Sequence, residues 1–544
     1  MTDQAMPRGG IPPAPASDHH PLHSHHGGLI AKLGPFVAFG VLGIGAAYAC
    51  FALVSDLEGG PSNATAVYLL LGVALLIALG FEFVNGFHDT ANAVATVIYT
   101  NSLPAHVAVI WSGFFNFLGV MVSTGAVAFG IISLLPVELI LQVGSNAGFA
   151  MVFALLIAAI LWNLGTWYYG IPNSSSHALI GSIIGVGLMN QLMAANGSGT
   201  SGVDWDQALG VGKSLLFSPL AGFFVAGLML ILAKFLLRIP ALYKPPVGKE
   251  PPPWWIRGLL VFTCTGVSFA HGSNDGQKGM GLIMLILIGT VPTTYALNRA
   301  VPESYGATFD KTSIAAAQII SKKAEGYSVL GNPRPAVTQY VARHEVNEGT
   351  FPSLAVLVKQ IGDNVKEYGT LAKVPAREVG NERNDMYLTS EAVRLLMKDK
   401  AAELSKDDVA VLTDYKKSLD TGTKFIPTWV KVAVAIALGL GTMVGWKRIV
   451  VTVGEKIGKE HLSYGQGAAA ELTAMGLIMA ADGYGLPVST THVLSSGVAG
   501  TMAANGSGLQ MSTLRSMALA WVLTLPAAIV LSGSLFALLR YLFG

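Results

Sequence analysis

The chain has 544 residues, of which 52% are hydrophobic and only 12% are charged, and its formal net charge is +2. Soluble domains carry about 25% charged residues, so this composition, with a mean hydropathy of +0.54, excludes a soluble enzyme and predicts a chain embedded in a lipid bilayer. No stripe of Lys and Arg interleaves with aromatic residues, which argues against a nucleic-acid partner.

The chain begins with a tail over 1–28 that holds five of the twelve histidines and lacks the charged and apolar regions of a cleavable signal. We interpret this His-rich tail as disordered. The next part, 29–65, is predicted to be an extra N-terminal transmembrane helix and its connection.

Segments of roughly 20 mostly apolar residues are long enough to cross a bilayer as a helix. Such segments occur at 33–54, 66–84, 105–133, 147–169, 214–237, 258–290, 428–446 and 513–541. Shorter glycine-rich apolar stretches, which predict half-spans, re-entrant hairpins or broken helices, occur at 174–192, 466–482 and 489–504. The fold class expected is an all-α polytopic membrane protein.

Two hydrophilic stretches interrupt the apolar segments. More than half of the Lys, Arg, Asp and Glu residues lie within 295–427, and the mixed charges and helical patterning of this stretch predict a soluble insertion. The other stretch, 239–257, includes Lys244, Lys249 and Arg257. Because Lys and Arg favour the cytoplasmic side of a membrane, we predict that 239–257 is a cytoplasmic linker.

One motif with a central Asp occurs twice. NGFHDTANA at 85–93 aligns with HGSNDGQKG at 271–279, at an offset of 186 that pairs Asp89 with Asp275. Internal repeats determine the architecture of a chain, so this pair predicts two related halves.

A second motif with Pro, Ser or Thr, and His also occurs twice. IPNSSSHALIG at 171–181 aligns with LPVSTTHVLSS at 486–496, at an offset of 315 that pairs His177 with His492. In each copy, the Asp motif precedes the Pro-Ser/Thr-His motif.

The two offsets differ by about the length of the charged stretch, which therefore interrupts the second repeat. The predicted first repeat is 66–238, and the second consists of 258–294 and 428–544 on either side of the insertion 295–427. The distribution of Lys and Arg predicts that the repeats run oppositely through the membrane. Inverted repeats place the substrate site near the bilayer midplane.

The paired acidic residues predict coupling to an ion. Asp89 and Asp275 lie in or beside apolar segments, where an ionised carboxylate costs about 2.5 to 3.5 kcal/mol. A carboxylate beside an anion site repels the anion unless it also holds a cation or a proton. His88 and Glu82 add groups that can titrate nearby. A helix-capping role is the alternative for a single Asp.

Hydroxyl residues follow the proline of each Pro-Ser/Thr-His motif. Ser and Thr cap the free backbone N–H groups at a helix start, and such a start directs several donors and the positive end of the helix dipole at one point. We predict that the two copies together bind an oxyanion, although an ordinary capping turn is the alternative for one copy. The predicted substrate-binding residues are Ser174, Ser175, Ser176, Ser489, Thr490 and Thr491.

Motifs of known enzyme classes are missing from the apolar body. It holds no HExxH, no GxSxG and no clustered Cys and His ligands. We therefore predict no catalytic residue, no resident metal and no cofactor, and we do not expect an enzyme.

Five motifs resemble the inorganic phosphate transporter (Pit) family, in particular its low-affinity bacterial phosphate permeases. The resemblance extends from about residue 68 to 543 and is weakest across 295–427. The motifs are NGFHDTANAVATVIYT (85–100), AHGSNDGQKGMG (270–281), PNSSSHALIG (172–181), GEKIGK (454–459) and LPVSTTHVLSSGVAGTM (486–502).

The resemblance implies a homodimer in the bacterial inner membrane that transports phosphate, or a neutral metal-phosphate complex, by symport with protons in the bacterial subgroup and with sodium in others. By the family pattern, phosphate would contact the six Ser and Thr residues, and Asp89, Asn92, Asn274 and Asp275 would lie in the coupling-ion region. Lys278 departs from the sodium-coupled pattern, which has Asn there, so protons are favoured over sodium.

The leading hypothesis is a proton-coupled phosphate symporter, with sodium coupling as its alternative. A site of hydroxyls and N–H groups would also accept sulfate or another oxyanion. A passive anion channel would need a continuous polar pore without midplane carboxylates, so the paired Asp residues argue against it. A receptor or structural role is suggested only by the insertion.

Overall fold

The computed structural model describes residues 29–58, 65–194, 202–246, 248, 250–324, 329, 331–399 and 402–543. The side chains of 29–35, 38 and 89–92 lie outside this description, as does the predicted His-rich tail. Throughout the described part of the chain, regular structure is helical, and one isolated bridge joins Gly458 to Leu509.

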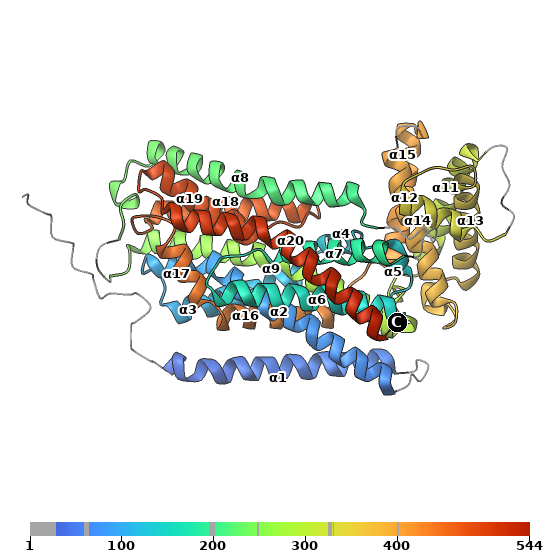
Figure 1. Cartoon of the computed structure of the whole chain (residues 1–544), viewed down its shortest axis with the longest axis horizontal. Coiled ribbons are helices and arrows are strands. Elements are labelled where there is room, and N and C mark those ends of the chain that lie inside the picture. The colour runs from blue at the N-terminus through green and yellow to red at the C-terminus, as the bar shows by residue number, and fades with distance from the viewer. Residues whose placement is uncertain are drawn as a thin grey trace, which may run out of the picture.

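The helices before the predicted linker lie mostly lengthwise in one bundle (Figure 1). They are α1 (Leu29–Leu57), α2 (Thr65–Tyr99), α3 (Ala105–Val122), α4 (Ala126–Ile132), α5 (Val137–Leu141), α6 (Asn146–Tyr168), α7 (Ser175–Met193) and α8 (Trp205–Leu236).

The later helices complete the bundle and add a helical group at one end of it (Figure 1). They are η2 (Pro240–Leu242), α9 (Trp254–Thr290), α10 (Pro292–Tyr295), α11 (Tyr305–Lys323), α12 (Arg334–Arg343), α13 (Thr350–Tyr368), η3 (Leu371–Lys373), α14 (Val379–Lys398), α15 (Lys406–Thr423), α16 (Thr428–Val444), α17 (Lys447–Glu455), α18 (Tyr464–Gly483), α19 (Thr490–Asn505) and α20 (Met511–Phe543).

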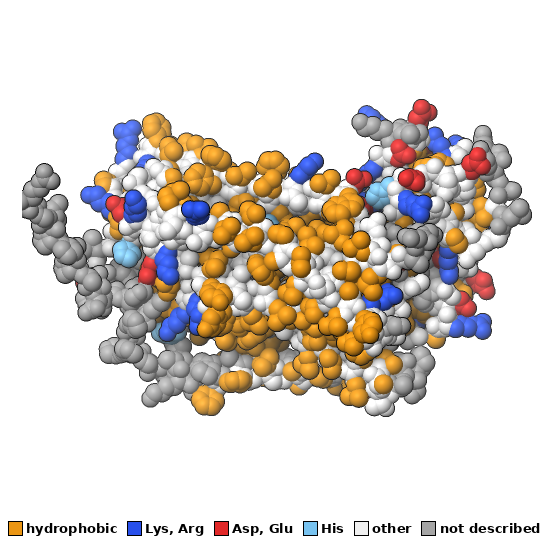
Figure 2. Space-filling view, in the orientation of Figure 1, with side chains coloured by type: hydrophobic (Ala, Val, Ile, Leu, Met, Phe, Trp, Pro, Cys, Tyr) orange, Lys and Arg blue, Asp and Glu red, His pale blue; other side chains and the backbone are white. Residues whose placement is uncertain are grey.

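The middle of the molecule has an apolar surface. Hydrophobic side chains cover the long helices in Figure 2, whereas Lys, Arg, Asp and Glu gather at the two ends. Seven helices of the described residues are long and apolar enough to cross a membrane. This distribution is that of a polytopic membrane protein, because charged groups avoid the hydrocarbon region.

The segment 105–133 is not the single span that its composition predicts. α3 ends at Val122 and α4 begins at Ala126, after Gly125 with a φ of +87°. A left-handed residue cannot continue an α-helix, and Gly adopts this conformation without strain. The apolar run therefore divides into one span and a short helix.

The short glycine-rich stretches also form helices, which differ in length. α19 has 16 residues, which is less than a full span, whereas α7 and α18 have 19 and 20 residues. By contrast, α2 is longer than predicted, because it extends beyond 66–84 and includes the whole first Asp motif.

Glycines set the closest helix crossings. A Cβ at Gly441 of α16 would lie 2.0 Å from the carbonyl oxygen of Phe83 in α2, and one at Gly119 of α3 would lie 2.1 Å from that of Phe269 in α9. Small residues at membrane helix interfaces allow this close backbone approach. The residue numbers of the two phenylalanines differ by 186, which is the offset of the Asp motifs.

The other long helices pack in corresponding pairs. α7 packs against α20 and α19 against α8, while α6 packs against α20 and α18 against α8. Each pair becomes the other when α6, α7 and α8, which precede the linker, are exchanged for α18, α19 and α20, which follow it. The bundle thus contains two sets of equivalent contacts.

Helices α11–α15 lie beyond one end of the bundle, and α17 lies at the other end (Figure 1). Asn384 Nδ2 donates to the Leu141 carbonyl oxygen at 3.0 Å, and Arg383 Nη1 donates to that of Ile140 at 3.3 Å. These bonds fix α14 to the short helix α5, so the predicted insertion is in direct contact with the first repeat.

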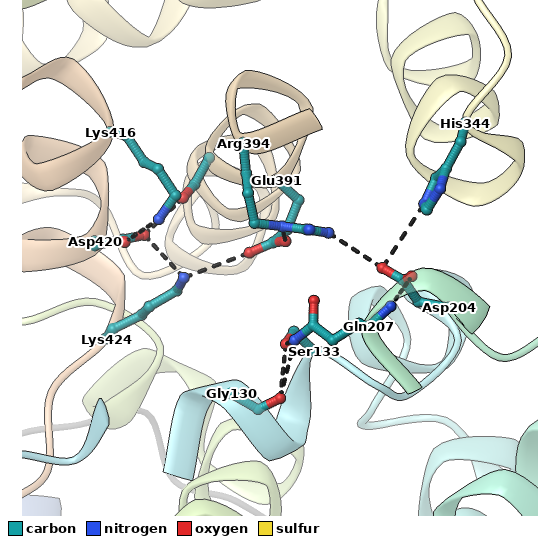
Figure 3. Close-up of polar contacts among 11 residues, drawn as sticks. Gly130, Ser133, Asp204, Gln207, His344, Glu391, Arg394, Lys416, Asp420 and Lys424 are labelled. Atoms are coloured by element: carbon teal, nitrogen blue, oxygen red, sulfur yellow. Dashed lines mark hydrogen bonds and ion pairs between the residues drawn. The ribbon is translucent and has the colours of Figure 1, made fainter. Parts of the chain in front are cut away.

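A partly buried ionic network strengthens this contact (Figure 3). Arg394 lies 2.6 Å from Glu391 and 3.2 Å from Asp204, the residue that caps α8, and His344 lies 3.7 Å from the same Asp204 oxygen. Burial acts to raise the pKa of Glu391, but the positive charges of Lys424 and Arg394 outweigh it and lower that pKa. Glu391 is therefore ionised and holds Arg394 toward the bundle.

Candidate functional site

Both Pro-Ser/Thr-His motifs form capped helix starts. The Ser174 hydroxyl accepts from the His177 backbone N–H at 3.1 Å, and α7 begins at the next residue. In the second copy, the Ser489 hydroxyl accepts from the His492 N–H at 3.1 Å, and α19 begins directly after it. The local geometry agrees with the sequence prediction, because each serine satisfies an N–H that has no partner within its helix.

The two helix starts meet inside the bundle although 315 residues separate them in sequence. The rings of His177 and His492 have centroids 4.6 Å apart, and the Ser176 hydroxyl donates to the Val488 carbonyl oxygen at 2.7 Å. The positive ends of two helix dipoles therefore point toward one region. All six predicted substrate-binding residues are buried there: Ser174, Ser175, Ser176, Ser489, Thr490 and Thr491.

Two polar atoms at this junction are unpaired. Ser175 Oγ and His492 Nε2 are buried and have no hydrogen-bond partner among the described residues. The His492 ring stacks on Trp521, with centroids 4.1 Å apart, which fixes its plane. A buried polar atom without a partner costs free energy unless a ligand or water completes it, so both atoms can bond to a ligand.

The second Asp motif forms a buried ion pair on α9. Asp275 Oδ2 lies 2.6 Å from Lys278 Nζ and 3.5 Å from His271 Nε2. The other ring nitrogen of His271 lies 2.9 Å from Asn116 Oδ1 of α3. The three charged or titratable side chains are each about 1% exposed, so the cluster is shielded from solvent.

Glu82 of α2 adjoins this cluster. It is fully buried, and Asn85 Nδ2 donates to its Oε2 at 3.3 Å. A Cβ at Gly279 of α9 would lie 2.3 Å from Glu82 Cγ, so this glycine gives the carboxyl room beside the residue that follows Lys278. Glu82 and the Asp275 cluster thus form one electrostatic group.

Asn274 connects the second Asp motif to the second helix start. Its Nδ2 donates to the Leu486 carbonyl oxygen at 3.2 Å, three residues before the cap Ser489. On the same helix, Ser273 Oγ and Gln277 Nε2 each donate to Asp482 at 2.6 Å. The chain that leads into α19 is therefore bonded to the helix that carries Asp275.

His88 connects the first Asp motif to the first helix start in a similar way. Its Nε2 lies 2.8 Å from the Asn163 carbonyl oxygen. The Asn163 side-chain oxygen accepts from Asn173 Nδ2 at 3.2 Å, and Asn173 directly precedes Ser174. The predicted residues Asp89 and Asn92 lie within α2, but their side chains are outside the described residues.

Sequence reasoning missed two features of this region. Asn173 is buried and accepts from Thr524 Oγ1 of α20 at 2.6 Å, which orients the first helix start. Glu471 of α18 is fully buried, and the Thr263 hydroxyl donates to it at 2.5 Å. The signal for Glu471 was an acidic residue within the apolar stretch 466–482.

The described residues contain no group of three or more His, Cys, Asp or Glu side chains that could hold a metal ion. The site consists instead of hydroxyls, amides and N–H groups at two helix starts, beside a buried cluster of acids and one lysine. Such a site can surround a tetrahedral anion with hydrogen-bond donors and can hold a proton or a cation nearby.

The chain matches the phosphate transporter family over residues 85–532. It is 42% identical over 488 residues to the low-affinity inorganic phosphate transporter PitA of Escherichia coli strain K12, which covers 86% of this chain and 96% of that protein. It is 41% identical to PitB of the same strain, covering 86% and 96%.

A solved structure titled "The sodium-dependent phosphate transporter" overlaps 87% of this chain and 99% of its own, with 18% sequence identity and a TM-score of 0.47.

Proposed function

The chain belongs to the phosphate transporter family, and from this membership we propose that it is a low-affinity inorganic phosphate transporter that works as a proton-coupled symporter. Its relatives are transporters rather than enzymes, and its helices are those of an integral membrane protein. The observation that carries the assignment of the site is the meeting of two capped helix starts, with the Ser175 hydroxyl unpaired between them.

The phosphate site lies where α7 and α19 begin. Backbone N–H groups and hydroxyls donate to phosphate oxygens, and the two helix dipoles favour the negative charge. Neutral donors hold the anion without the permanent charge of an arginine, so the anion can also leave. The phosphate ligands are Ser174, Ser175, Ser176, Ser489, Thr490 and Thr491.

The helices form two inverted repeats, 66–238 and 258–294 joined with 428–544. The corresponding helix pairs support this reading. So does Arg257, whose Nε donates to the Ser102 carbonyl oxygen at 2.8 Å, because this bond places the end of α2 beside the start of α9. Two equivalent helices that run oppositely are what inversion requires.

Coupling involves the acidic cluster around Asp275. Glu82 and Asp275 are both buried, Glu82 lies against Gly279 of the helix that carries Asp275, and Asn274 bonds the cluster to the chain before Ser489. A proton taken up in the cluster can therefore change the field at the anion and the position of α19. Asp89, Asn92 and His88 belong to the corresponding region of the first repeat. Sodium is the alternative coupling ion, and phosphate can travel as a neutral metal complex.

Counterflow of labelled phosphate into proteoliposomes tests the transport. We expect exchange that phosphate and arsenate inhibit and that excess sulfate does not. Strong inhibition by sulfate would indicate a general oxyanion transporter of the same fold. Uptake against a gradient that a protonophore abolishes would exclude a passive channel and support proton coupling, whereas a strict sodium requirement would contradict it.

Neutralising the acids tests the coupling. Asp89→Asn and Asp275→Asn are each expected to abolish accumulation while the protein stays inserted, since a carboxyl that cannot ionise cannot exchange a coupling ion. Wild-type accumulation in both variants would remove these residues from the mechanism.

The remaining proposals concern assembly. We propose a homodimer in the bacterial inner membrane, with 239–257 as a cytoplasmic linker and 295–427 as a soluble accessory unit. Cross-linking in native membranes tests the dimer. Removal of 300–420 with transport retained would support the accessory role, and loss of transport in a well-inserted protein would contradict it.

A further inference from the structure

Lys278 places an ammonium group in the interior of the bundle. The residue is 1% exposed, and its Nζ lies 2.6 Å from Asp275 Oδ2. Lysine is almost never fully buried unless it is paired, and a charged residue at membrane depth usually has a functional reason. The ion pair explains how Lys278 is tolerated, but it leaves open what the positive charge does there.

The groups around Lys278 come from three helices. On α9 itself, Asp275 lies one turn before Lys278, and His271 lies one turn before Asp275. Glu82 of α2 and His177 of α7 lie close enough for the lysine charge to act on both. The ammonium group therefore belongs to the acidic cluster on α9, and its charge reaches one of the two helix starts.

The first repeat offers a position in the same chain with which Lys278 can be compared. At the offset of 186, Lys278 corresponds to Asn92, so the second Asp motif has an ammonium group where the first has a neutral amide. A neutral side chain beside a buried carboxylate would leave that charge to be balanced by a mobile cation. A lysine balances it without one.

We propose that Lys278 is a tethered cation, which occupies the position where an alkali metal ion would otherwise bind Asp275 and which balances the charge of this carboxylate whenever it is ionised. The role of Lys278 in transport rests on the proposed function. The claim that Lys278 takes the place of a bound cation does not. In this view, removal of the ammonium group creates a binding site for a monovalent cation.

A purely structural ion pair predicts something different. Breaking a buried pair by removing one partner is strongly destabilising, and removing both partners is much less so. Loss of stability in Lys278→Gln therefore cannot distinguish the two roles. A stabilisation of that variant by alkali cations can, because ligands that bind only the folded state raise its melting temperature.

The first experiment measures thermal unfolding of the purified full-length protein in choline, lithium, sodium and potassium chloride at equal ionic strength. We expect at least one alkali cation to raise the Tm of Lys278→Gln in a saturable way, by about 3 °C or more beyond its effect on the wild type. Lys278→Arg, which keeps a positive charge, and the double variant Asp275→Asn/Lys278→Gln should respond as the wild type does.

The proposal is overturned if alkali cations stabilise Lys278→Gln no more than the wild type, or if the double variant gains the same stabilisation. Where Lys278→Gln fails to fold in choline, folding that an alkali cation restores supports the proposal. If it folds in none of these salts, Lys278→Asn, which copies the residue of the first repeat, is measured in the same way. Failure of both variants in every salt would favour a purely structural lysine.

The second experiment measures phosphate counterflow by the same variants. We expect Lys278→Gln to exchange phosphate at least about tenfold faster in the stabilising cation than in choline, while the wild type keeps its own ratio. Equal rates of Lys278→Gln in both salts would overturn the role in transport. Absence of counterflow in the wild type would refute the proposed function, but the melting experiment would still decide whether Lys278 replaces a cation.

Discussion

Ser175 allows substrate binding to be separated from folding. Its hydroxyl is buried and has no hydrogen-bond partner among the described residues, so Ser175→Ala removes no intramolecular bond and leaves no other polar atom unpaired. An unpaired buried hydroxyl costs about 1 to 3 kcal/mol. We therefore expect the melting temperature of Ser175→Ala, measured without phosphate, to equal or exceed that of the wild type.

The same change should weaken phosphate binding. Ser175 is the first residue of α7, where its hydroxyl can donate to an anion together with the backbone N–H groups. Loss of one such bond is worth about 1.4 kcal/mol, which corresponds to a tenfold higher half-saturating phosphate concentration. Counterflow at a series of phosphate concentrations measures this shift.

Two further variants serve as controls. Ser495 of α19 also has a buried hydroxyl without a described partner, but it lies beyond the first turn, so Ser495→Ala should keep the wild-type affinity. Ser174→Ala removes the cap of α7 and should destabilise the protein by about 1 kcal/mol. The reasoning fails if Ser175→Ala keeps the wild-type affinity, or if Ser495→Ala loses affinity to the same extent.

Three other predictions concern stability. Burial raises the pKa of Glu382 to about 7 from its usual 4.5. Because the folded state keeps this proton while the unfolded chain releases it, the free energy of unfolding should fall by about 3 kcal/mol between pH 4.5 and 7. Melting curves of Glu382→Gln measured against pH should lack this fall. Arg394→Ala leaves the buried Glu391 and the partly buried Asp204 without this partner. A loss of about 3 kcal/mol is expected, seen as faster hydrogen exchange at the start of α8, and unchanged exchange there would contradict the docking role. Gly441→Ala would place a methyl group 2.0 Å from a backbone oxygen of α2 and should sharply lower the yield of folded protein, whereas Gly476→Ala, with no atom within 4 Å, should not.

The amino-acid sequence by itself determined those features that depend on local physics. Apolar length predicted the helices of the bundle, because roughly 20 such residues are needed to cross a bilayer. The cap residues Ser174 and Ser489 predicted the two helix starts, because a side-chain oxygen must satisfy the first free N–H groups. The repeated motifs also indicated which residues belong together, and the clustered charges marked the insertion.

Only the tertiary structure decided which of these features touch. The contact between His177 and His492, the position of Glu82 beside Gly279, and the docking of α14 on α5 join segments far apart in the chain. Such contacts depend on how helices pack, and helix packing depends on the shapes of both surfaces at once. A single segment does not contain this information. Asp275 and Lys278 are only three residues apart on α9, so their contact is local, but helix packing decided that both are buried inside the bundle.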